Sequence, residues 1–340
     1  MYYSILLCGY GSAGKYVSLV AEDSGRAYIK AVFDPNKEKK AEAKATYPDA
    51  ILGNDLRSLI RDTRPDIVAV ASPDHLHADQ TIMALELGSH VLVEKPMTTT
   101  VSDAERVIKV AEETGLTVMV DHTIRYMYPW REMSEAARAG EIGKIFFIQG
   151  DYIHDMSSIY QPDGNRHTPW RIDSENPQNI LFGGGCHPID NILSTINSQV
   201  VELFAYSSKE CVPAFPADDC YILMLKFKNG VLGKVFVTSG CSGEGIGGGL
   251  LAIYGDQGTL LHGKLHRRGK KPKTLRKLSR NTEVGGHGWG CSVVDFLDTL
   301  DGKRGNPISA RIGARVVAIC EAGLTSIRTG QPQVPVWPNP

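Results

Sequence analysis

A glycine-rich turn near the start of the chain has the spacing of a phosphate-binding loop. It follows the apolar run at residues 5–8 and reads G-x-G-x-x-G through Gly9, Tyr10, Gly11, Ser12, Ala13 and Gly14. In this pattern the first glycine permits a tight turn, the second lets the main chain approach a pyrophosphate, and the third lets helix and strand pack closely. The N–H groups that begin the following helix attract phosphate. The spacing therefore favours a dinucleotide site over a plain strand-to-helix connection.

Asp34 supports this interpretation. It ends the second apolar run of the sequence, 20 positions beyond Gly14, where a carboxylate accepts hydrogen bonds from the adenosine ribose. Because a carboxylate repels a 2′-phosphate, we expect NAD as the cofactor rather than NADP. Three lysines just beyond it would partly offset that repulsion if they faced the cofactor, although their pattern is typical of a solvated helix face; they are Lys37, Lys39 and Lys40.

The elements around this turn follow the rhythm of βαβ units. Helical patterns at residues 76–87 and 102–114 are ended by Gly88 and Gly115, since glycine commonly closes a helix. Short runs rich in Val and Ile have the composition of strands covered on both faces; they lie at residues 5–8, 29–33, 67–71, 90–93 and 117–120. The sequence predicts an α/β fold that begins with a parallel, doubly wound Rossmann domain over residues 1–122.

The pattern changes after residue 122, where a second domain spanning residues 123–340 is expected. A helical pattern covers residues 132–139, and an apolar run follows at 145–149. Asn229-Gly230 and glycine-rich turns separate three further apolar runs, which predicts an antiparallel meander; the runs lie at residues 221–227, 233–238 and 250–254. Two late helical stretches, at residues 293–300 and 311–327, are expected to pack back on a domain surface, including that of the first domain.

Composition excludes several classes of protein. With 340 residues, 42% hydrophobic residues and a net charge of −1, the chain is typical of a two-domain globular protein without a nucleic-acid partner. Its seven cysteines have no zinc-like spacing, so no metal site is expected and free thiols in a reducing cytosol fit best. No stretch approaches the roughly 18 apolar residues of a membrane span, and no basic segment precedes the first apolar run. We therefore expect a soluble, cytoplasmic protein.

Further segments occur in the order found in one enzyme family. They are the Ser72-Pro73 turn with His77, the triplet Glu94-Lys95-Pro96, Arg125-Tyr126, residues 140–143, residues 170–173, and three glycines at 183–185 that lead to His187. With the glycine turn and Asp34, they make nearly the whole chain resemble the family of glucose-fructose oxidoreductase, inositol dehydrogenase and MocA. The resemblance implies a Rossmann domain followed by an α/β domain with a large, open, mostly antiparallel sheet, and an NAD(P)-dependent oxidoreductase.

The resemblance assigns the strand end at Lys95 to the cofactor site. It places Lys95 beside the nicotinamide and the reacting hydroxyl, where an ammonium stabilises developing alkoxide charge. It also implies a cis peptide before Pro96. Neighbouring residues assigned to the cofactor by the same resemblance are Ser72, Pro73, His77 and Glu94. The alternative for Lys95 is a surface lysine at a strand end.

His187 matches the catalytic histidine of the family. It would begin a helix after a close-approach loop at residues 183–186. A neutral imidazole takes the hydroxyl proton while hydride leaves carbon, and donates a proton in the reducing direction. The alternative is a structural or exposed histidine. Many relatives carry an aspartate four residues earlier, where this chain has Gly183; Asp190 or Asp173 is expected to orient the histidine or the substrate instead, unless Asp190 is an ordinary helix-face carboxylate.

Other polar and aromatic residues are candidates to hydrogen-bond or stack against a carbohydrate. Each has a structural alternative, such as an exposed pair of His154 with Asp155 or a core position for Trp170. The residues are Arg125, Tyr152, His154, Trp170 and Arg171. The glycine-rich segment 240–249 reads as a loop bordering the site or as a mere connection. The basic stretch 267–280 lacks interleaved aromatics and the total charge is near zero, which argues against a nucleic-acid contact. It is expected to be a solvated excursion or a subunit contact, with an acidic substrate reached by this arm as the alternative.

Three functions are compatible with these residues. The first is hydride transfer between NAD(P) and a hydroxyl-bearing carbon of a sugar, inositol or related polyol, carried by Lys95 and His187. The second is a glycosidase-like reaction in which bound NAD oxidises the substrate only transiently. The third is a non-catalytic sensor of dinucleotide or sugar, against which the presence of both Lys95 and His187 argues. By analogy with relatives, a homodimer or homotetramer formed through the open sheet is expected.

Overall fold

The computed structural model describes residues 1–212, 215–241, 249–278 and 288–338. The chain forms two compact units. The first consists of Met1–Tyr126 and a later segment that ends at Ala314, and the second begins at Met127 and includes Arg315–Trp337. Helix α10 (Ala310–Thr329) contributes residues to both units.

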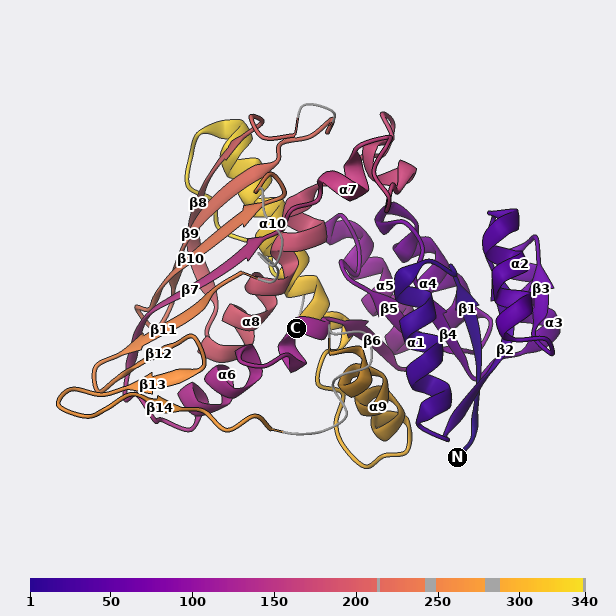
Figure 1. Ribbon diagram of the computed structural model, residues 1–340, viewed down its shortest axis with the longest axis horizontal. Coiled ribbons are helices and arrows are strands. Elements are labelled where there is room, and N and C mark those ends of the chain that lie inside the picture. Colours follow the sequence, from indigo (N-terminus) through magenta and orange to yellow (C-terminus); the bar gives the residue numbers. More distant parts are fainter. Residues whose placement is uncertain (213–214, 242–248, 279–287, 339–340) are drawn as a thin grey trace. The chain divides into compact units, whose positions relative to one another are not determined.

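The first unit is built on a six-stranded parallel sheet (Figure 1). Its order is β3-β2-β1-β4-β5-β6. The strands are thus added outward from β1 in one direction up to β3 and, from β4 on, in the other direction, so the strand order reverses between β1 and β4. All six residues of β1 are buried. This is the doubly wound Rossmann arrangement, in which ligands bind outside the carboxyl ends of the strands at the reversal point. The predicted fold of this part is confirmed. The strands are β1 (Tyr3–Cys8), β2 (Ala27–Phe33), β3 (Ile51–Gly53), β4 (Ile67–Val70), β5 (His90–Glu94) and β6 (Val118–Asp121).

Local signals set the ends of the helices in this unit. The Asn36 side chain accepts N–H bonds from Glu38 and Lys39, which begins α2, and the Thr100 hydroxyl accepts from Asp103 N–H to begin α5. Gly115, at φ 67°, ends α5 in the left-handed conformation that glycine favours. The elements are α1 (Ser12–Asp23), α2 (Lys37–Thr46), α3 (Leu56–Thr63), η1 (Asp74–Leu76), α4 (His77–Glu86), α5 (Val101–Thr114), η2 (Thr123–Tyr126) and α9 (Trp289–Leu300).

Helix α9 returns from the late part of the sequence to the first unit. Its Phe296 is 1% exposed and belongs to the same core cluster as the parallel strands. The Trp289 ring stacks on Tyr16 of α1 with ring centroids 4.5 Å apart. The α9 helix therefore completes the core of a domain that the first 126 residues do not finish by themselves.

The second unit contains an eight-stranded, mostly antiparallel sheet of order β14-β13-β12-β11-β7-β10-β9-β8. The predicted fold class is thus confirmed here as well. In Figure 1, α8 and α10 lie on one side of this sheet, and none of the described helices of the second unit lies on the other. Its strands are β7 (Ile145–Ile153), β8 (Val200–Ser208), β9 (Cys220–Phe227), β10 (Leu232–Thr238), β11 (Leu251–Gly255), β12 (Thr259–Leu261), β13 (Lys264–His266) and β14 (Lys273–Thr274).

One part of the predicted strand pairing is wrong. Strands β9 and β10 pair antiparallel as expected, but β11 does not continue the meander. Instead β7 lies between them, parallel to β10 and antiparallel to β11. Turn residues report only local reversals of the chain, whereas β7 reaches its place from about 80 residues away in the sequence. The remaining elements are α6 (Trp130–Arg138), α7 (Ser157–Tyr160), η3 (Pro169–Ile172), η4 (Leu181–Gly185) and α8 (Cys186–Ile196).

If α9 completes the first core, removing its main anchor should destabilise that unit. We predict that Phe296→Ala lowers the free energy of unfolding by about 3–5 kcal/mol, because it leaves a cavity in a packed core. Urea denaturation followed by circular dichroism measures the change. Leu19→Ala is the matched control, since Leu19 is 48% exposed on α1. Equal stability of the two variants would contradict the role given to α9.

Candidate active site

The glycine turn leaves no room for side chains at two of its positions. Gly9 has φ +100°, and a Cβ there would lie 2.5 Å from the Ala71 carbonyl oxygen. A Cβ on Gly14 would lie 2.1 Å from the Gly9 carbonyl oxygen. At Gly11, by contrast, an added Cβ would meet no described atom within 4 Å, and α1 begins there without a capping side chain. The backbone is thus open where a phosphate would approach its N–H groups.

Asp34 is tied to this turn. One carboxylate oxygen accepts the Tyr10 N–H at 2.8 Å, and the other accepts the Asn36 N–H at 2.8 Å. The residue is only 8% exposed. Because each carboxylate oxygen has a second lone pair, these bonds leave acceptor capacity for ribose hydroxyls. The carboxylate therefore both shapes the turn and fits the predicted ribose contact.

His77 links two loops at the carboxyl ends of β4 and β5. Its Nδ1 lies 2.7 Å from the Pro96 carbonyl oxygen and its Nε2 lies 2.9 Å from the Ser72 carbonyl oxygen. The ring is buried, with 1% exposed. The peptide before Pro96 is cis, as the resemblance implied. His77 thus braces the Ser72 and Lys95-Pro96 segments through their main chains.

Two carboxyl groups lie at the strand ends next to Lys95. Glu94 accepts N–H bonds from the Trp289 indole at 3.1 Å and from the Lys95 main chain at 3.2 Å. Asp121 is fully buried and accepts a hydrogen bond from the Ser292 hydroxyl. Burial, and secondly the charge of Glu94, raise the pKa of Asp121 well above its ordinary value. Sequence reasoning included Glu94 but missed Asp121, which directly follows the predicted strand 117–120.

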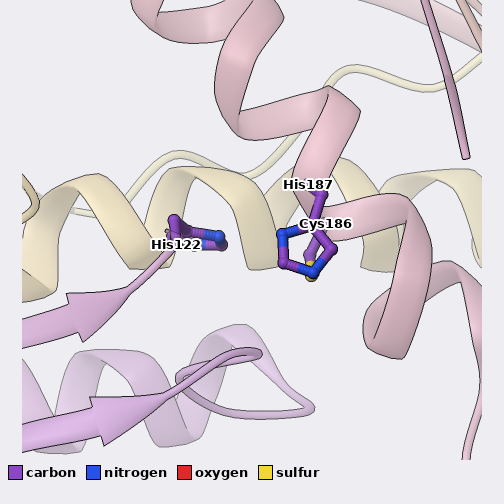
Figure 2. Close-up of side chains that lie close together, drawn as sticks. All are labelled: His122, Cys186 and His187. Atoms are coloured by element: carbon purple, nitrogen blue, oxygen red, sulfur yellow. The ribbon is translucent and has the colours of Figure 1, made fainter. Parts of the chain in front are cut away.

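His187 lies in the second unit, in the first turn of α8, as predicted. Figure 2 shows it next to Cys186 at the start of that helix, and shows His122 just past the end of β6. The Tyr152 ring stacks on the His187 ring with centroids 5.8 Å apart, and the Tyr152 hydroxyl lies 2.9 Å from His154 Nδ1. Three of the predicted site residues are thereby brought together.

The segment before His187 was predicted to be a loop, but it forms a helical turn. Residues Leu181–Gly185 make a π-helical turn that runs directly into α8. The glycines are needed for packing, since a Cβ on Gly184 would lie 2.5 Å from the Tyr152 ring, and one on Gly185 would lie 2.9 Å from Val237. Glycine therefore marks close approach here, as predicted, but within a helical turn.

Gln178 fills the space beside Gly183, and sequence reasoning missed it. A Cβ on Gly183 would lie 2.6 Å from Gln178 Nε2. The Gln178 side chain is buried and accepts a hydrogen bond from the Arg171 guanidinium, which also lies 4.7 Å from the centroid of the Trp170 ring. An amide and a guanidinium therefore stand beside the position where many relatives carry a carboxylate. The only sequence signal was the glycine itself.

The remaining predicted site residues have mixed surroundings. Asp173 Oδ1 accepts the N–H groups of Glu175 and Asn176, both at 2.9 Å, which shapes a turn. Arg125 lies in the first unit and donates to the Pro307 carbonyl oxygen at 2.9 Å. Asp190 is 1% exposed on α8. Lys95 and His187 belong to different units.

Two segments singled out in the sequence are described only in part. Of the glycine-rich segment 240–249, residues 242–248 lie outside the described residues, as do 279–280 of the basic stretch. In the described part of that stretch, Arg267 forms a salt bridge with Glu141 at 2.6 Å, and Lys270 and Lys271 are exposed. No helix among the described residues is long and apolar enough to cross a membrane.

The chain matches two sequence models of one family. Residues 3–122 match an oxidoreductase family with an NAD-binding Rossmann fold, and residues 130–261 match the GFO/IDH/MocA C-terminal domain. Among curated relatives, a 1-carboxy-3-chloro-3,4-dihydroxycyclohexa-1,5-diene dehydrogenase of Comamonas testosteroni is 27% identical over 62% of this chain. A levoglucosan dehydrogenase of Pseudarthrobacter phenanthrenivorans is 25% identical over 63%. The matches span 51% and 60% of these two relatives.

Solved structures show the same fold over the whole length. An oxidoreductase from Agrobacterium radiobacter, crystallised with NAD+, L-tartaric acid and magnesium, superposes with a TM-score of 0.85 and covers 98% of both chains at 20% identity. The parallel sheet, strands β7–β12 of the second sheet, the glycine turn with Asp34, and the segments that carry Lys95 and His187 lie within the two matched family regions. The chain therefore belongs to the GFO/IDH/MocA family of NAD-binding oxidoreductases.

Proposed function

We propose that this protein is an NAD-dependent dehydrogenase or reductase that acts on a hydroxyl-bearing carbon of a sugar, inositol or related polyol. In this proposal residues 1–122 would form the cofactor domain, with its core completed by α9, and residues 123–340 would otherwise form the substrate and assembly domain. The observation that carries the proposal is the open backbone at Gly11, between two glycines that have no room for side chains and beside Asp34. This combination fits a dinucleotide and has no evident purpose in a plain turn.

The turn would hold the pyrophosphate through N–H groups at the start of α1, where no side chain caps the helix. Asp34 would accept hydrogen bonds from the adenosine ribose, and its charge disfavours NADP. The Ser72-Pro73 turn and the Glu94-Lys95-Pro96 segment would border the cofactor, held in place by His77. When bound, NAD supplies the group that accepts or donates the hydride.

Lys95 and His187 would act on the reacting hydroxyl. The Lys95 ammonium stabilises negative charge that develops on the oxygen, and the His187 imidazole takes or gives the proton. His187 lies in the first turn of α8, directly after the π-helical turn Leu181–Gly185. The stacked Tyr152 ring holds the imidazole plane. Hydride and proton then leave the same C–OH group.

The substrate class rests on the kinds of candidate side chains that the second unit offers and on the relatives. Tyr152, His154, Trp170 and Arg171 combine hydrogen-bonding and stacking groups, which suits a polyhydroxylated molecule. Arg125, Asp173 and Asp190 are further candidates. A levoglucosan dehydrogenase and a 1,5-anhydro-D-fructose reductase are among the relatives. None of the seven cysteines, all within the described residues, forms a disulfide bond, which supports a reducing, cytoplasmic location.

The uncovered face of the eight-stranded sheet supports a homo-oligomer. On β9 and β10, Met224 and Leu232 are 45% and 48% exposed, and Tyr206 of β8 is 66% exposed. Phe147 lies beside Leu232 across the β7–β10 pair. A row of apolar side chains on an open sheet is an interaction surface. We propose that two copies of the chain cover it, giving a homodimer or homotetramer.

The decisive experiment is a screen of sugars, inositols and polyols with purified protein and NAD. The absorbance of reduced nicotinamide and the identity of the product are followed together. A dehydrogenase forms NADH and ketone in equal amounts. Glycoside cleavage without net NADH would establish the glycosidase-like alternative, and ligand binding without turnover would establish a sensor.

Loss of either proposed catalytic group should nearly stop turnover. We predict that Lys95→Met lowers kcat by about 10²–10³-fold, because alkoxide stabilisation is lost. His187→Ala should lower kcat by about 10²–10⁴-fold through loss of the general base. Steady-state kinetics measure both effects, and circular dichroism checks that the variants fold.

Matched controls are Lys109→Met and His75→Ala, both at exposed positions. These controls should keep the activity of the natural protein. Undiminished activity in Lys95→Met and His187→Ala would refute the two assignments.

The cofactor preference should depend on the charge of Asp34. We predict that Asp34→Asn weakens NAD binding by about 10–100-fold, because a charged hydrogen bond to the ribose becomes a neutral one. NADP binding should weaken less, since the repulsion of its 2′-phosphate is removed. Calorimetric titration with each cofactor measures the two Kd values, with Asp49→Asn, at an exposed position, as the control. An unchanged ratio of the Kd values would contradict this role.

A charge placed on the open sheet face should separate the subunits. We predict that Met224→Asp with Leu232→Asp raises the dissociation constant of the oligomer at least about 100-fold, because two apolar residues of the proposed interface become charged. Sedimentation velocity at several concentrations measures this. Leu19→Asp, at an exposed position on α1, should leave assembly unchanged. A monomeric natural protein, or an unaltered oligomer in the double variant, would rule the surface out.

A further inference from the structure

Two carboxyl groups are buried side by side in the first unit. Glu94 and Asp121 are the last residues of β5 and β6, and they are direct partners in the register of this parallel strand pair. Glu94 is 8% exposed and Asp121 is 0% exposed. Neighbouring strands are about 5 Å apart, so two ionised carboxylates at these positions would repel each other strongly in a poorly solvated place.

The hydrogen-bond donors around the pair are unequally distributed. Glu94 receives one N–H donor on each oxygen, from Trp289 and from the Lys95 main chain. Within the part of the chain that the structure describes, Asp121 receives only the Ser292 hydroxyl, on Oδ1. Its Oδ2 is buried and has no partner among the described residues if the group is ionised. A proton on Oδ2 would turn this oxygen into a donor toward Glu94 and satisfy both groups.

We propose that Glu94 and Asp121 share one proton, held on Asp121, and that the single negative charge left on the pair keeps Lys95 in its ammonium form. Burial and, secondly, the nearby Glu94 charge both raise the pKa of Asp121. A raised pKa favours the protonated form of Asp121 that the proposal needs. The Lys95 charge acts on the pKa of Asp121 in the opposite direction and lowers it. The pair is thus a positioning device for the charge of Lys95, and this consequence rests on the proposed function of Lys95.

Two other charged groups on the surrounding elements interact with partners outside the pair. On α9, Asp295 is paired with Arg304. On η2, Arg125 donates to the Pro307 carbonyl oxygen. Further titratable groups on these elements are Tyr126 on η2, whose pKa burial raises, Tyr16 of α1, which stacks on Trp289, the buried Cys291 beside Ser292 on α9, and His122, which follows Asp121 in the chain. The charge balance near Lys95 is therefore set mainly by the Glu94–Asp121 pair.

Infrared spectroscopy tests the shared proton without any cofactor or turnover. At pH 7 the natural protein should show the C=O stretch of a protonated, buried carboxyl group, and Asp121→Asn should lose it. Asp79→Asn removes an ionised carboxylate that is 74% exposed and should leave this band intact. Ser292→Ala is a milder second variant that should also keep the band, because losing the Ser292 hydrogen bond further disfavours the ionised form of Asp121.

The pH profile tests the effect on Lys95. Asp121→Asn replaces a neutral acid by a neutral amide and keeps the charge on Glu94, so the alkaline limb of kcat/KM should stay in place. The double variant Glu94→Gln with Asp121→Asn removes the charge. Without a nearby anion the pKa of Lys95 falls, and the alkaline limb should move to lower pH by about one unit.

The outcomes separate this proposal from the proposed function. If the natural protein lacks the protonated-acid band, or if Asp121→Asn keeps it, the shared proton is refuted whatever the enzyme does. If Asp121→Asn moves the alkaline limb as far as the double variant does, Asp121 carries the charge and the assignment is overturned. If the double variant leaves the limb unmoved, the pair does not act on Lys95. A protein without NAD-dependent turnover would refute the proposed function and leave the infrared result standing.

Discussion

The arrangement of the first unit depends on the close approach of main chains at the turn after β1. The Gly14 position faces the Gly9 carbonyl oxygen, and the Gly9 position faces that of Ala71, with no space for a Cβ at either. The Gly9 N–H bonds to Phe33 of β2, and the Ala71 N–H bonds to Cys8 of β1. Three strands are therefore joined at this one turn, and the start of α1 has a fixed place before any ligand arrives.

The sequence was sufficient wherever the signal is local. Runs of Val and Ile gave the central parallel strands, and the glycine spacing gave the turn. Strand pairings between distant segments could not be predicted from the sequence. No local pattern near residues 145–153 indicates that β7 lies between β10 and β11. Gln178 was not predicted as a site residue either, because its amide comes to lie against Gly183 only in the folded chain. Asp121 was closer to being predictable, since it follows a recognised strand, but its partner Glu94 requires the order of the strands.

Buried polar side chains, rather than further backbone ladders, hold the loops at the carboxyl ends of the parallel strands. Asp34 bonds to the Tyr10 N–H, and His77 bonds to the carbonyl oxygens of Ser72 and Pro96. Burying such groups costs free energy that only well-formed hydrogen bonds offset. Apolar side chains at this edge of the sheet would cost less free energy to bury. They could not, however, hold the irregular main chain of these loops in one conformation, because they form no hydrogen bonds with it.

The Glu94–Asp121 pair extends this logic from shape to charge. Both residues could be replaced by apolar ones if only packing mattered, and burying two acids together is the costlier choice. The cost falls when one group is neutral, because a single proton removes the repulsion and turns the Asp121 Oδ2 atom, which otherwise has no partner among the described residues, into a donor toward Glu94. The same proton leaves one negative charge next to Lys95 instead of two. A buried acid pair can therefore set the charge beside Lys95, whereas an exposed carboxylate would be screened by solvent.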